Sequence, residues 1–223
     1  MLPKTLTSDP IRIFETVAKV ARTLGIGMDK FLVTGGSAAW LYGSVRPFSD
    51  DYDFMVDRET RKFLGKEKGI VFIRNAHKPV FHSLLAPVPE MGSSVALIAE
   101  SVVLPSPLPG VECRFEWVPF LADGIRSFTF ESGTINAVPV ELITIIKLLA
   151  ARGTEMGKYD LEDAAAMLAH TPTFDTHLAL GIIDRFCQPV DETLPLLLAN
   201  LEKAEGVLPS DQLFNLREAL TAT

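Results

Sequence analysis

Two aspartates separated by one residue form the part of the sequence with the clearest chemical meaning. Asp51 and Asp53 belong to a segment, 51–56, in which acidic and apolar side chains alternate. This alternation predicts a β-strand, on which the two carboxylates point to the same face about 6.6 Å apart. Two carboxylates at this spacing can converge on one divalent cation, or on two cations about 3.5–4 Å apart, as in sites that transfer phosphoryl groups. We therefore predict a metal site at Asp51 and Asp53.

A pair of glycines upstream could supply the second half of such a site. Gly35 and Gly36 follow the apolar run 31–34, which predicts a buried strand, and precede a predicted short helix over 37–42. Glycine at this turn allows backbone N–H groups and the start of a helix to approach a bound phosphate, which a side chain would obstruct. Either motif alone more often marks an ordinary turn or a solvated strand end. Their order and spacing together favour a site that holds both a metal and phosphates.

In this order and spacing the sequence resembles the nucleotidyltransferase superfamily, which has the DNA polymerase β-like fold. The shared pattern is a glycine-rich turn, Gly35-Gly36-Ser37 here, followed by an acid-x-acid pair on a strand, Asp51-Tyr52-Asp53. The resemblance implies that the two aspartates bind Mg²⁺ or Mn²⁺ and that the three turn residues contact a nucleoside triphosphate. The segment that leads into the acid pair also resembles the small transferases of this group. The resemblance implies that two of its residues, Arg46 and Ser49, lie near the phosphates.

Members of the superfamily usually supply a third carboxylate from a later strand. Such a group completes the metal site and can accept the proton of the attacking hydroxyl. Segment 112–118 alternates polar with apolar residues and predicts a strand with Glu112, Arg114 and Glu116 on one face. We expect Glu116 to be the third metal ligand and a catalytic residue, with Glu112 as the alternative. The competing interpretation is that this face is simply exposed to water.

A second segment, 138–163, carries a further resemblance. A proline and a glutamate at the start of a predicted helix, a lysine within it and two later aspartates form a pattern similar to bacterial nucleotidyltransferases of the AbiE abortive-infection toxin type. The resemblance implies that Lys147 reaches the triphosphate or the base as a catalytic residue. Asp160, with Asp163 as a further candidate, would hold or complement that lysine. The alternative is a lysine that extends from its helix to solvent and an aspartate that caps the next helix.

The elements that must position these residues fall into two parts. Up to about residue 137 the pattern mixes helices with short predicted strands, at 31–34, 51–56, 70–74, 94–104 and 112–118. After it, proline or glycine signals separate five predicted helices, at 140–152, 161–169, 176–187, 194–205 and 211–222. We expect an α/β (α+β) fold, with a nucleotidyltransferase-like mixed sheet flanked by helices and followed by a helical bundle. The expected domains are 1–137, the catalytic domain, and 138–223, the helical domain.

Composition excludes several other classes of protein. The chain of 223 residues has 28 acidic against 21 basic residues, a formal net charge of −7, which argues against a broadly basic surface but allows a local basic groove. Its two cysteines, Cys113 and Cys187, form no Cys-x-x-Cys motif, which argues against a disulfide framework and a cysteine zinc site. No apolar stretch reaches membrane-spanning length, and no Gly-Lys-Ser/Thr phosphate-binding loop occurs. We expect a cytoplasmic protein that needs no membrane partner.

These features and resemblances predict a Mg²⁺-dependent enzyme that transfers a nucleoside monophosphate from a nucleoside triphosphate, such as ATP, to an acceptor and releases pyrophosphate. The AbiE-type resemblance implies a tRNA acceptor and a toxin that an antitoxin protein neutralises. A small-molecule acceptor, as in antibiotic-modifying nucleotidyltransferases, is the alternative that needs no basic surface. A third interpretation is a protein that binds a nucleotide, or a partner protein, without turnover, because Glu116 stands where many relatives have aspartate.

Overall fold

An eight-stranded mixed sheet forms the first part of the chain in the computed structural model, which describes residues 9–44, 51–74, 82–91, 94–105, 112–117 and 119–222. Its strands are β1 (Leu32–Thr34), β2 (Tyr52–Met55), β3 (Ile73–Arg74), β4 (His82–Pro87), β5 (Val95–Pro105), β6 (Glu112–Glu116), β7 (Arg126–Phe130) and β8 (Gly133–Ala137). The order across the sheet is β3-β4-β5-β2-β1-β8-β7, and β6 pairs with the later part of β5. β1 with β8 and β2 with β5 are parallel pairs, whereas the other pairs are antiparallel. The expected mixed sheet is confirmed.

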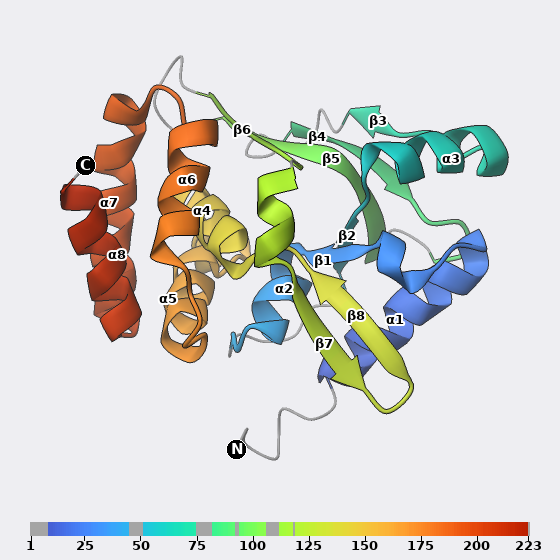
Figure 1. The fold of residues 1–223 in the computed structure, drawn as a ribbon, viewed down its shortest axis with the longest axis horizontal. Coiled ribbons are helices and arrows are strands. Elements are labelled where there is room, and N and C mark those ends of the chain that lie inside the picture. The colour runs from blue at the N-terminus through green and yellow to red at the C-terminus, as the bar shows by residue number, and fades with distance from the viewer. Residues whose placement is uncertain are drawn as a thin grey trace.

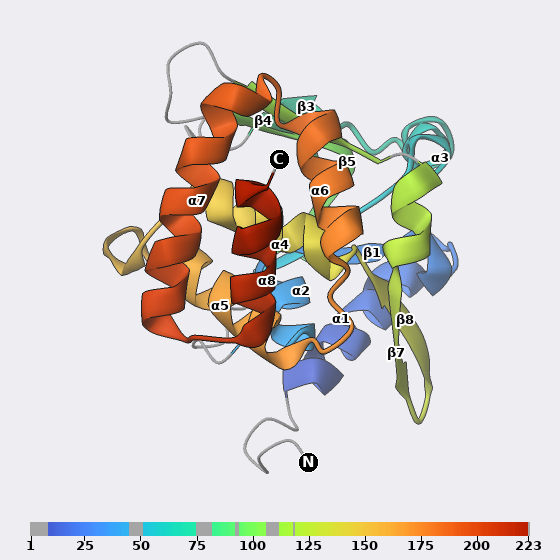
Figure 2. The same ribbon diagram turned by 60° about the vertical axis from the view of Figure 1, so that its left-hand side comes forward.

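Helices cover this sheet and then form a bundle of their own. Those within the first part are α1 (Asp9–Leu24), α2 (Gly35–Leu41) and α3 (Arg58–Lys68). Those after β8 are α4 (Val140–Ala150), α5 (Asp160–His170), α6 (Thr176–Phe186), α7 (Val190–Val207) and α8 (Asp211–Thr221). Figure 1 shows α4 to α8 gathered on one side of the sheet, and Figure 2 brings this side forward. The expected helical bundle after the sheet is therefore confirmed.

Local sequence signals explain where several helices begin and end. The side chain of Asp57 accepts a hydrogen bond from the Thr60 N–H at 2.6 Å and so caps the start of α3. Gly69, with a left-handed φ of 65°, ends the same helix. Asp175 and Ser210 cap α6 and α8 in the same way. These caps fix helix ends that the apolar periodicity alone leaves uncertain by a residue or two.

Five elements differ from the sequence-based expectation. β4 and the hairpin of β7 and β8 were not predicted, and the strand expected over 70–74 is reduced to Ile73–Arg74. β8 forms part of the sheet because it pairs with β1, which lies about a hundred residues earlier in the chain. Such a long-range pairing has no local signal in the sequence. α7 also begins at Val190, earlier than expected, and contains Pro195 within its first two turns.

The helix α4 links the two parts of the molecule. Residues 140–149 of this helix are all buried. α4 packs against α2 and β5 of the first part and against α5, α6 and α7 of the second part. A helix that is buried on every side belongs to the centre of a fold. No helix among the described residues is both long and apolar enough to cross a membrane. The division into domains at residue 137 stays a prediction, because α4 is shared by both parts.

Candidate functional site

The start of α2 and the strand β2 meet at Gly35 and Asp53. Thr34, the last residue of β1, pairs with Asp53 of β2. Gly35 then begins α2 with a left-handed φ of 61°. A Cβ atom added to Gly35 would lie 2.7 Å from Oδ2 of Asp53. Glycine is thus required here both for its backbone conformation and because the Asp53 carboxylate lies directly against it.

The alternation of β2 places Asp53 on the opposite face from Tyr52 and Phe54, the face that also carries the buried Met55. The rings of Tyr52 and Phe54 are both buried and stack with their centroids 6.4 Å apart, which confirms the expected alternation. Asp53 is half-buried on the opposite face, and Asp51 is exposed just before the strand. The Ser37 hydroxyl donates a hydrogen bond to the backbone carbonyl of Asp51 at 3.4 Å. We refer to the two aspartates together with the first turn of α2 as the aspartate site.

Replacement of Gly35 by alanine tests the contact that shapes the aspartate site. We expect Gly35→Ala to be destabilised by about 1–2 kcal/mol through its left-handed backbone, and to displace the Asp53 carboxylate as well. Gly157→Ala is the matched control, because Gly157 has a φ of 65° and nothing within 4 Å of an added Cβ atom. Urea unfolding should therefore show a larger loss for Gly35→Ala than for Gly157→Ala. Equal losses would mean that the Asp53 side chain moves away from the added Cβ atom without loss of stability. Gly35 would then be required only for its backbone conformation.

The sheet register separates Glu116 from the aspartate site. Asp53 lies opposite Ala96 of β5, whereas Glu116 lies opposite Ser101. Five positions along a strand correspond to about 16 Å. Glu112 pairs with Pro105, farther along the same strand. The structure therefore does not place the expected third carboxylate beside Asp53. The sequence-based choice of Glu116 followed from its alternating strand, but strand alternation carries no information on the position of that strand along its neighbour.

Glu116 instead belongs to a different surface cavity. It is exposed and borders a cavity of about 540 Å³ together with Asp57, Arg58, Glu59, Ser101 and Trp117. Among the described residues, no group of three or more His, Cys, Asp or Glu side chains could hold a metal ion. Arg46 and Ser49, the predicted phosphate contacts, lie outside the described residues. The described part of the aspartate site thus offers two carboxylates.

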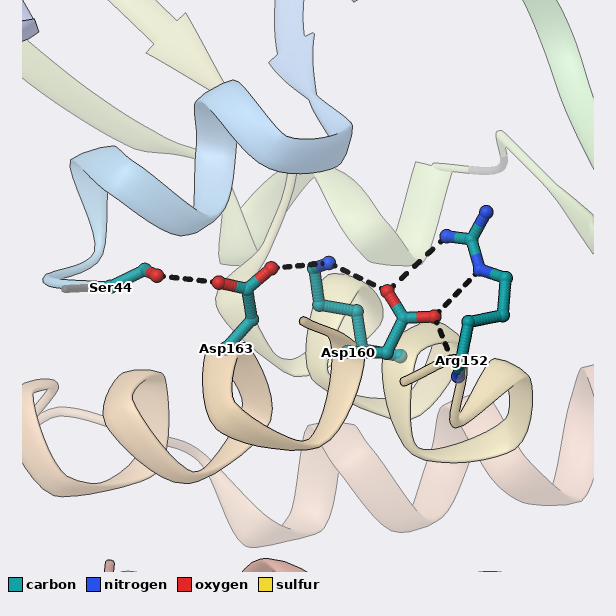
Figure 3. A network of polar contacts seen from close by, with 5 residues as sticks. Ser44, Arg152, Asp160 and Asp163 are labelled. Carbon is teal, nitrogen blue, oxygen red and sulfur yellow. Dashed lines mark hydrogen bonds and ion pairs between the residues drawn. The ribbon is translucent and has the colours of Figure 1, made fainter. Parts of the chain in front are cut away.

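Lys147 lies in a buried row of charged side chains under α2. Its Nζ atom is 2.6 Å from Oδ2 of Asp163 and 3.0 Å from Oδ1 of Asp160. Asp163 also accepts a hydrogen bond from the Ser44 hydroxyl at 2.5 Å, and Asp160 accepts one from Nε of Arg152 at 2.7 Å. Figure 3 shows the row with Ser44 at one end, just after α2, and Arg152 at the other. The pairing of Lys147 with Asp160 and Asp163 that the resemblance implied is present.

In the structure Lys147 does not extend to solvent and Asp160 does not cap its helix. Lys147 is only 6% exposed, so its amino group does not extend to solvent. Asp160 is the first residue of α5, and its carboxylate binds Lys147 and Arg152 instead of capping the helix. Burial would raise the pKa of Asp160, but the charges of Lys147 and Arg152 outweigh it and hold the pKa below its usual value. Two cations thus balance two carboxylates inside the protein, as a buried charge requires.

A further buried carboxylate, that of Glu141, has a raised pKa, in contrast to the lowered pKa of Asp160. Glu141, on α4, is fully buried, and its Oε1 atom accepts a hydrogen bond from the Asp175 N–H at 2.8 Å. Arg126 lies 3.8 Å from the same oxygen. Burial raises the pKa of Glu141, and these partners only partly offset it. Nearby, the Tyr42 hydroxyl donates to the Val138 carbonyl at 2.6 Å and ties the end of α2 to the start of α4.

The raised pKa of Glu141 predicts a pH dependence of stability. The folded state binds this proton more tightly than the unfolded state, so stability falls as the pH rises from about 4.5 through the raised value. We expect Glu141→Gln to remove this loss, so that the variant gains stability relative to the wild type as the pH increases. Urea unfolding over this range measures the difference, with Glu15→Gln on the exposed face of α1 as control. A difference that shifts toward the wild type at high pH would show that Arg126 fully stabilises the ionised carboxylate.

Sequence reasoning missed three members of these buried networks. These are Ser44, Arg152 and Tyr42. Ser44 and Tyr42 contact residues that lie 119 and 96 positions away, whereas Arg152 binds Asp160 eight positions later. A buried lysine within an apolar helix was the one local signal that such partners must exist.

Comparison with known proteins gives distant structural likeness only. Neither a protein-family profile nor a curated protein sequence matches the chain. A candidate nucleotidyltransferase from Thermotoga maritima aligns over 59% of this chain and 80% of its own, with 14% identity and a TM-score of 0.41. An antigenic nucleotidyltransferase-like protein from Paracoccidioides brasiliensis aligns over 94% and 98%, with 13% identity and a TM-score of 0.40. A candidate nucleotidyltransferase from H. pylori aligns over 99% and 98%, with 14% identity and a TM-score of 0.40. Similarity at this level does not extend an activity to this chain.

Proposed function

We propose that this protein is a nucleotidyltransferase that moves a nucleoside monophosphate from a nucleoside triphosphate to an acceptor. The observation that carries the proposal is the aspartate site, where the Asp53 carboxylate lies against Gly35 at the β1–α2 turn and Asp51 precedes it on the exposed side of β2. The reaction joins an acceptor oxygen to the α-phosphorus and releases pyrophosphate. It requires positioning and charge neutralisation more than covalent participation by the protein.

The donor set of this site suits a hard divalent cation. Mg²⁺ prefers oxygen ligands, and proteins often hold it through one or two carboxylates while substrate phosphates and water complete its coordination. Asp51 and Asp53 meet this requirement, since one is exposed and the other half-buried beside a glycine. They would hold Mg²⁺ or Mn²⁺. When bound, the ion would neutralise phosphate charge and polarise the transferred group.

Other residues of the proposal act by position. The backbone of Gly35 and Gly36 and the start of α2 at Ser37 would face the triphosphate, while Arg46 and Ser49 would lie near its phosphates. We propose that Asp160 is a positioning residue, because it pairs with Lys147 and Arg152 and so holds α5 against α4. The catalytic contact of Lys147 with the triphosphate stays a prediction. Its two carboxylate partners support a positioning role under α2.

Nucleotide binding without turnover is a second candidate function. The observation that favours it is Ala96, which occupies the place opposite Asp53 on the neighbouring strand where a third carboxylate would complete the site. Among the described residues no group of three or more acidic, His or Cys side chains gathers into a metal site, so no third carboxylate is in place to accept the acceptor proton. A protein of this kind would bind the nucleoside triphosphate together with the cation and leave it intact.

The acceptor distinguishes two forms of the proposed enzyme. A tRNA acceptor would suit a toxin that an antitoxin partner neutralises, whereas a small molecule would suit an enzyme of the antibiotic-modifying kind. Expression in a bacterial host separates them. Growth arrest that Asp51→Asn relieves favours the toxin, and harmless expression favours the small-molecule enzyme.

Radiolabelled nucleotides test the proposed function directly. The protein is incubated with each α-labelled nucleoside triphosphate and Mg²⁺, with total RNA or a panel of hydroxylated small molecules as acceptor. Incorporation of label into an acceptor with release of pyrophosphate supports transfer. Retention of intact nucleotide on the protein, with no label transferred, supports the binding protein. Absence of both binding and transfer, with Mg²⁺ or Mn²⁺, contradicts both functions.

A further inference from the structure

The helix α3 carries a concentration of positive charge that contrasts with the rest of the protein. It contains five basic and two acidic residues, whereas the remainder of the chain has 16 basic and 26 acidic residues. An acidic protein therefore presents one short, strongly basic element. An overall net charge of −7 conceals this separation, because it averages over the whole surface.

The basic residues of α3 occupy one continuous face. At about 100° per residue, they fall within an arc of about 160° on the side of the helix away from the buried Thr60 and Leu64. Four of these basic residues are exposed and Arg61 is half-buried; the set is Arg58, Arg61, Lys62, Lys66 and Lys68. Glu59 lies at the border of the arc, whereas Glu67 lies about 100° outside it, near the buried Thr60. We call these five residues the basic face of α3.

The positive surface continues onto the end of α1. A Cβ atom at Gly25, just after α1, would lie 3.2 Å from Nζ of Lys68, so the ends of α1 and α3 are adjacent. In Figure 1 the two helices lie at the end of the molecule opposite the helical bundle. Arg22, in the last turn of α1, is exposed. On this face Lys66 forms an ion pair with the adjacent Glu67 at 3.2 Å, and an exposed pair of this kind is weak.

An exposed aromatic ring adjoins this face. Phe63 is 42% exposed and lies three positions before Lys66, which places the two side chains side by side on α3. Surfaces that bind single-stranded nucleic acid combine cations along the backbone with aromatic rings on which bases stack. Lysine is depleted at protein–protein interfaces, which disfavours a protein partner. Leu64 faces the core, so α3 has no free apolar face of the width that a membrane-surface helix inserts.

We infer that the basic face of α3, with Phe63 at its edge, binds single-stranded RNA. The backbone phosphates would contact the lysines and arginines, and a base would stack on Phe63. The identification of this RNA as the acceptor rests on the proposed function, but binding itself requires no transfer. The basic face thus provides the local positive surface that an RNA acceptor needs on an acidic protein.

A salt-dependent binding measurement tests this inference. The probe is fluorescently labelled oligouridine of about 12 nucleotides, and its anisotropy is followed between about 50 and 200 mM salt. We expect Lys62→Gln/Lys66→Gln to weaken binding and to reduce the slope of log K against log salt by about 1.4. Phe63→Ala should weaken binding about tenfold and leave the slope unchanged.

Matched controls separate a specific surface from general charge. Arg185→Gln/Lys203→Gln removes the same charge from α6 and α7, where both side chains are exposed, and should leave the affinity and the slope as in the wild type. Far-UV circular dichroism confirms that each variant is folded. Failure of the wild type to bind oligouridine, or equal losses in the two double variants, would overturn the inference. Tighter binding to polyglutamate or to phosphatidylserine vesicles than to oligouridine would overturn it too.

The experiment also distinguishes this inference from the proposed function. Asp51→Asn/Asp53→Asn should bind oligouridine as the wild type does, because the aspartate site is separate from α3. If the wild type binds RNA through α3 but transfers no label, the inference holds and the proposed transfer fails. If it transfers label to a small molecule but does not bind RNA, the proposed function holds and the inference fails.

Discussion

Asp53→Asn is expected to reduce nucleotidyl transfer by about 10²-fold or more. The substitution removes one negative charge from the aspartate site but keeps nearly the same shape beside Gly35. Loss of one preorganised group that stabilises transition-state charge typically costs about 10²–10³ in rate. The measurement is the initial rate of label transfer with saturating Mg²⁺, together with the concentration of Mg²⁺ that gives half the maximal rate. We expect this concentration to rise in the variant, because a neutral amide binds Mg²⁺ less well than a carboxylate.

Glu116→Gln is the matched control for this prediction. It makes the same chemical change on a residue that the sheet register separates from Asp53 by five positions along β5. We expect its rate to stay within about twofold of the wild type, since surface substitutions away from a site have small effects. A loss in Glu116→Gln as large as that in Asp53→Asn would contradict the separation of the two residues. A full rate in Asp53→Asn would contradict the proposed metal site.

Lys147→Met is expected to lower the free energy of unfolding by about 3–5 kcal/mol. The substitution keeps an unbranched apolar side chain in place of the lysine stem but removes the ammonium group, so one of the two cations beside the buried carboxylates is lost. Asp160 keeps Arg152 as a partner, whereas Asp163 loses its ion pair with Lys147 and keeps the hydrogen bond from Ser44. Removing one member of a buried ion pair is strongly destabilising for this reason. Urea unfolding followed by circular dichroism measures the loss.

Two further variants make the Lys147 prediction specific. Lys62→Met changes an exposed lysine on α3 and should alter stability by less than about 0.5 kcal/mol. Lys147→Met/Asp163→Asn removes both charges of the shorter pair and should be less destabilised than the sum of its two single variants. If Lys147→Met is as stable as the wild type but loses binding of the nucleoside triphosphate, then Lys147 contacts the substrate and its ion pairs contribute little to the fold.

The overall composition does not define where the charges of the protein lie. A net charge of −7 argued against a broad basic surface, and no such surface is needed for the inference on α3. What composition could not reveal is that five basic residues share one helix face, because this depends on helix phase and on which side of α3 is buried. The buried Thr60 and Leu64 fix that phase. Whether this acidic protein can bind an RNA acceptor therefore depends on the basic face of α3, and the salt dependence of binding tests it.

Local pattern determined much of the site. The apolar run before Gly35, the glycine turn and the alternation around Tyr52 each act over a few residues, so the strand, the helix start and the separation of Asp53 from the face of Tyr52 could be predicted. The pairing of Lys147 with the aspartates of α5 was implied by resemblance and supported by physics, since a charge within an apolar helix must find an opposite charge. These predictions depended on short-range geometry or on an unavoidable energetic requirement.

Tertiary structure alone decided the remaining features. The place of Glu116 depends on how far β6 is shifted along β5, and an alternating strand pattern is compatible with many such shifts. The contact between Ser44 and Asp163 joins residues 119 positions apart, and β8 pairs with a strand about a hundred residues earlier. Such contacts arise from the packing of whole elements, whose free energy is spread over many side chains. The sequence by itself therefore determined which residues could perform the chemistry, and the packing of β5, α4 and α5 determined which of them meet.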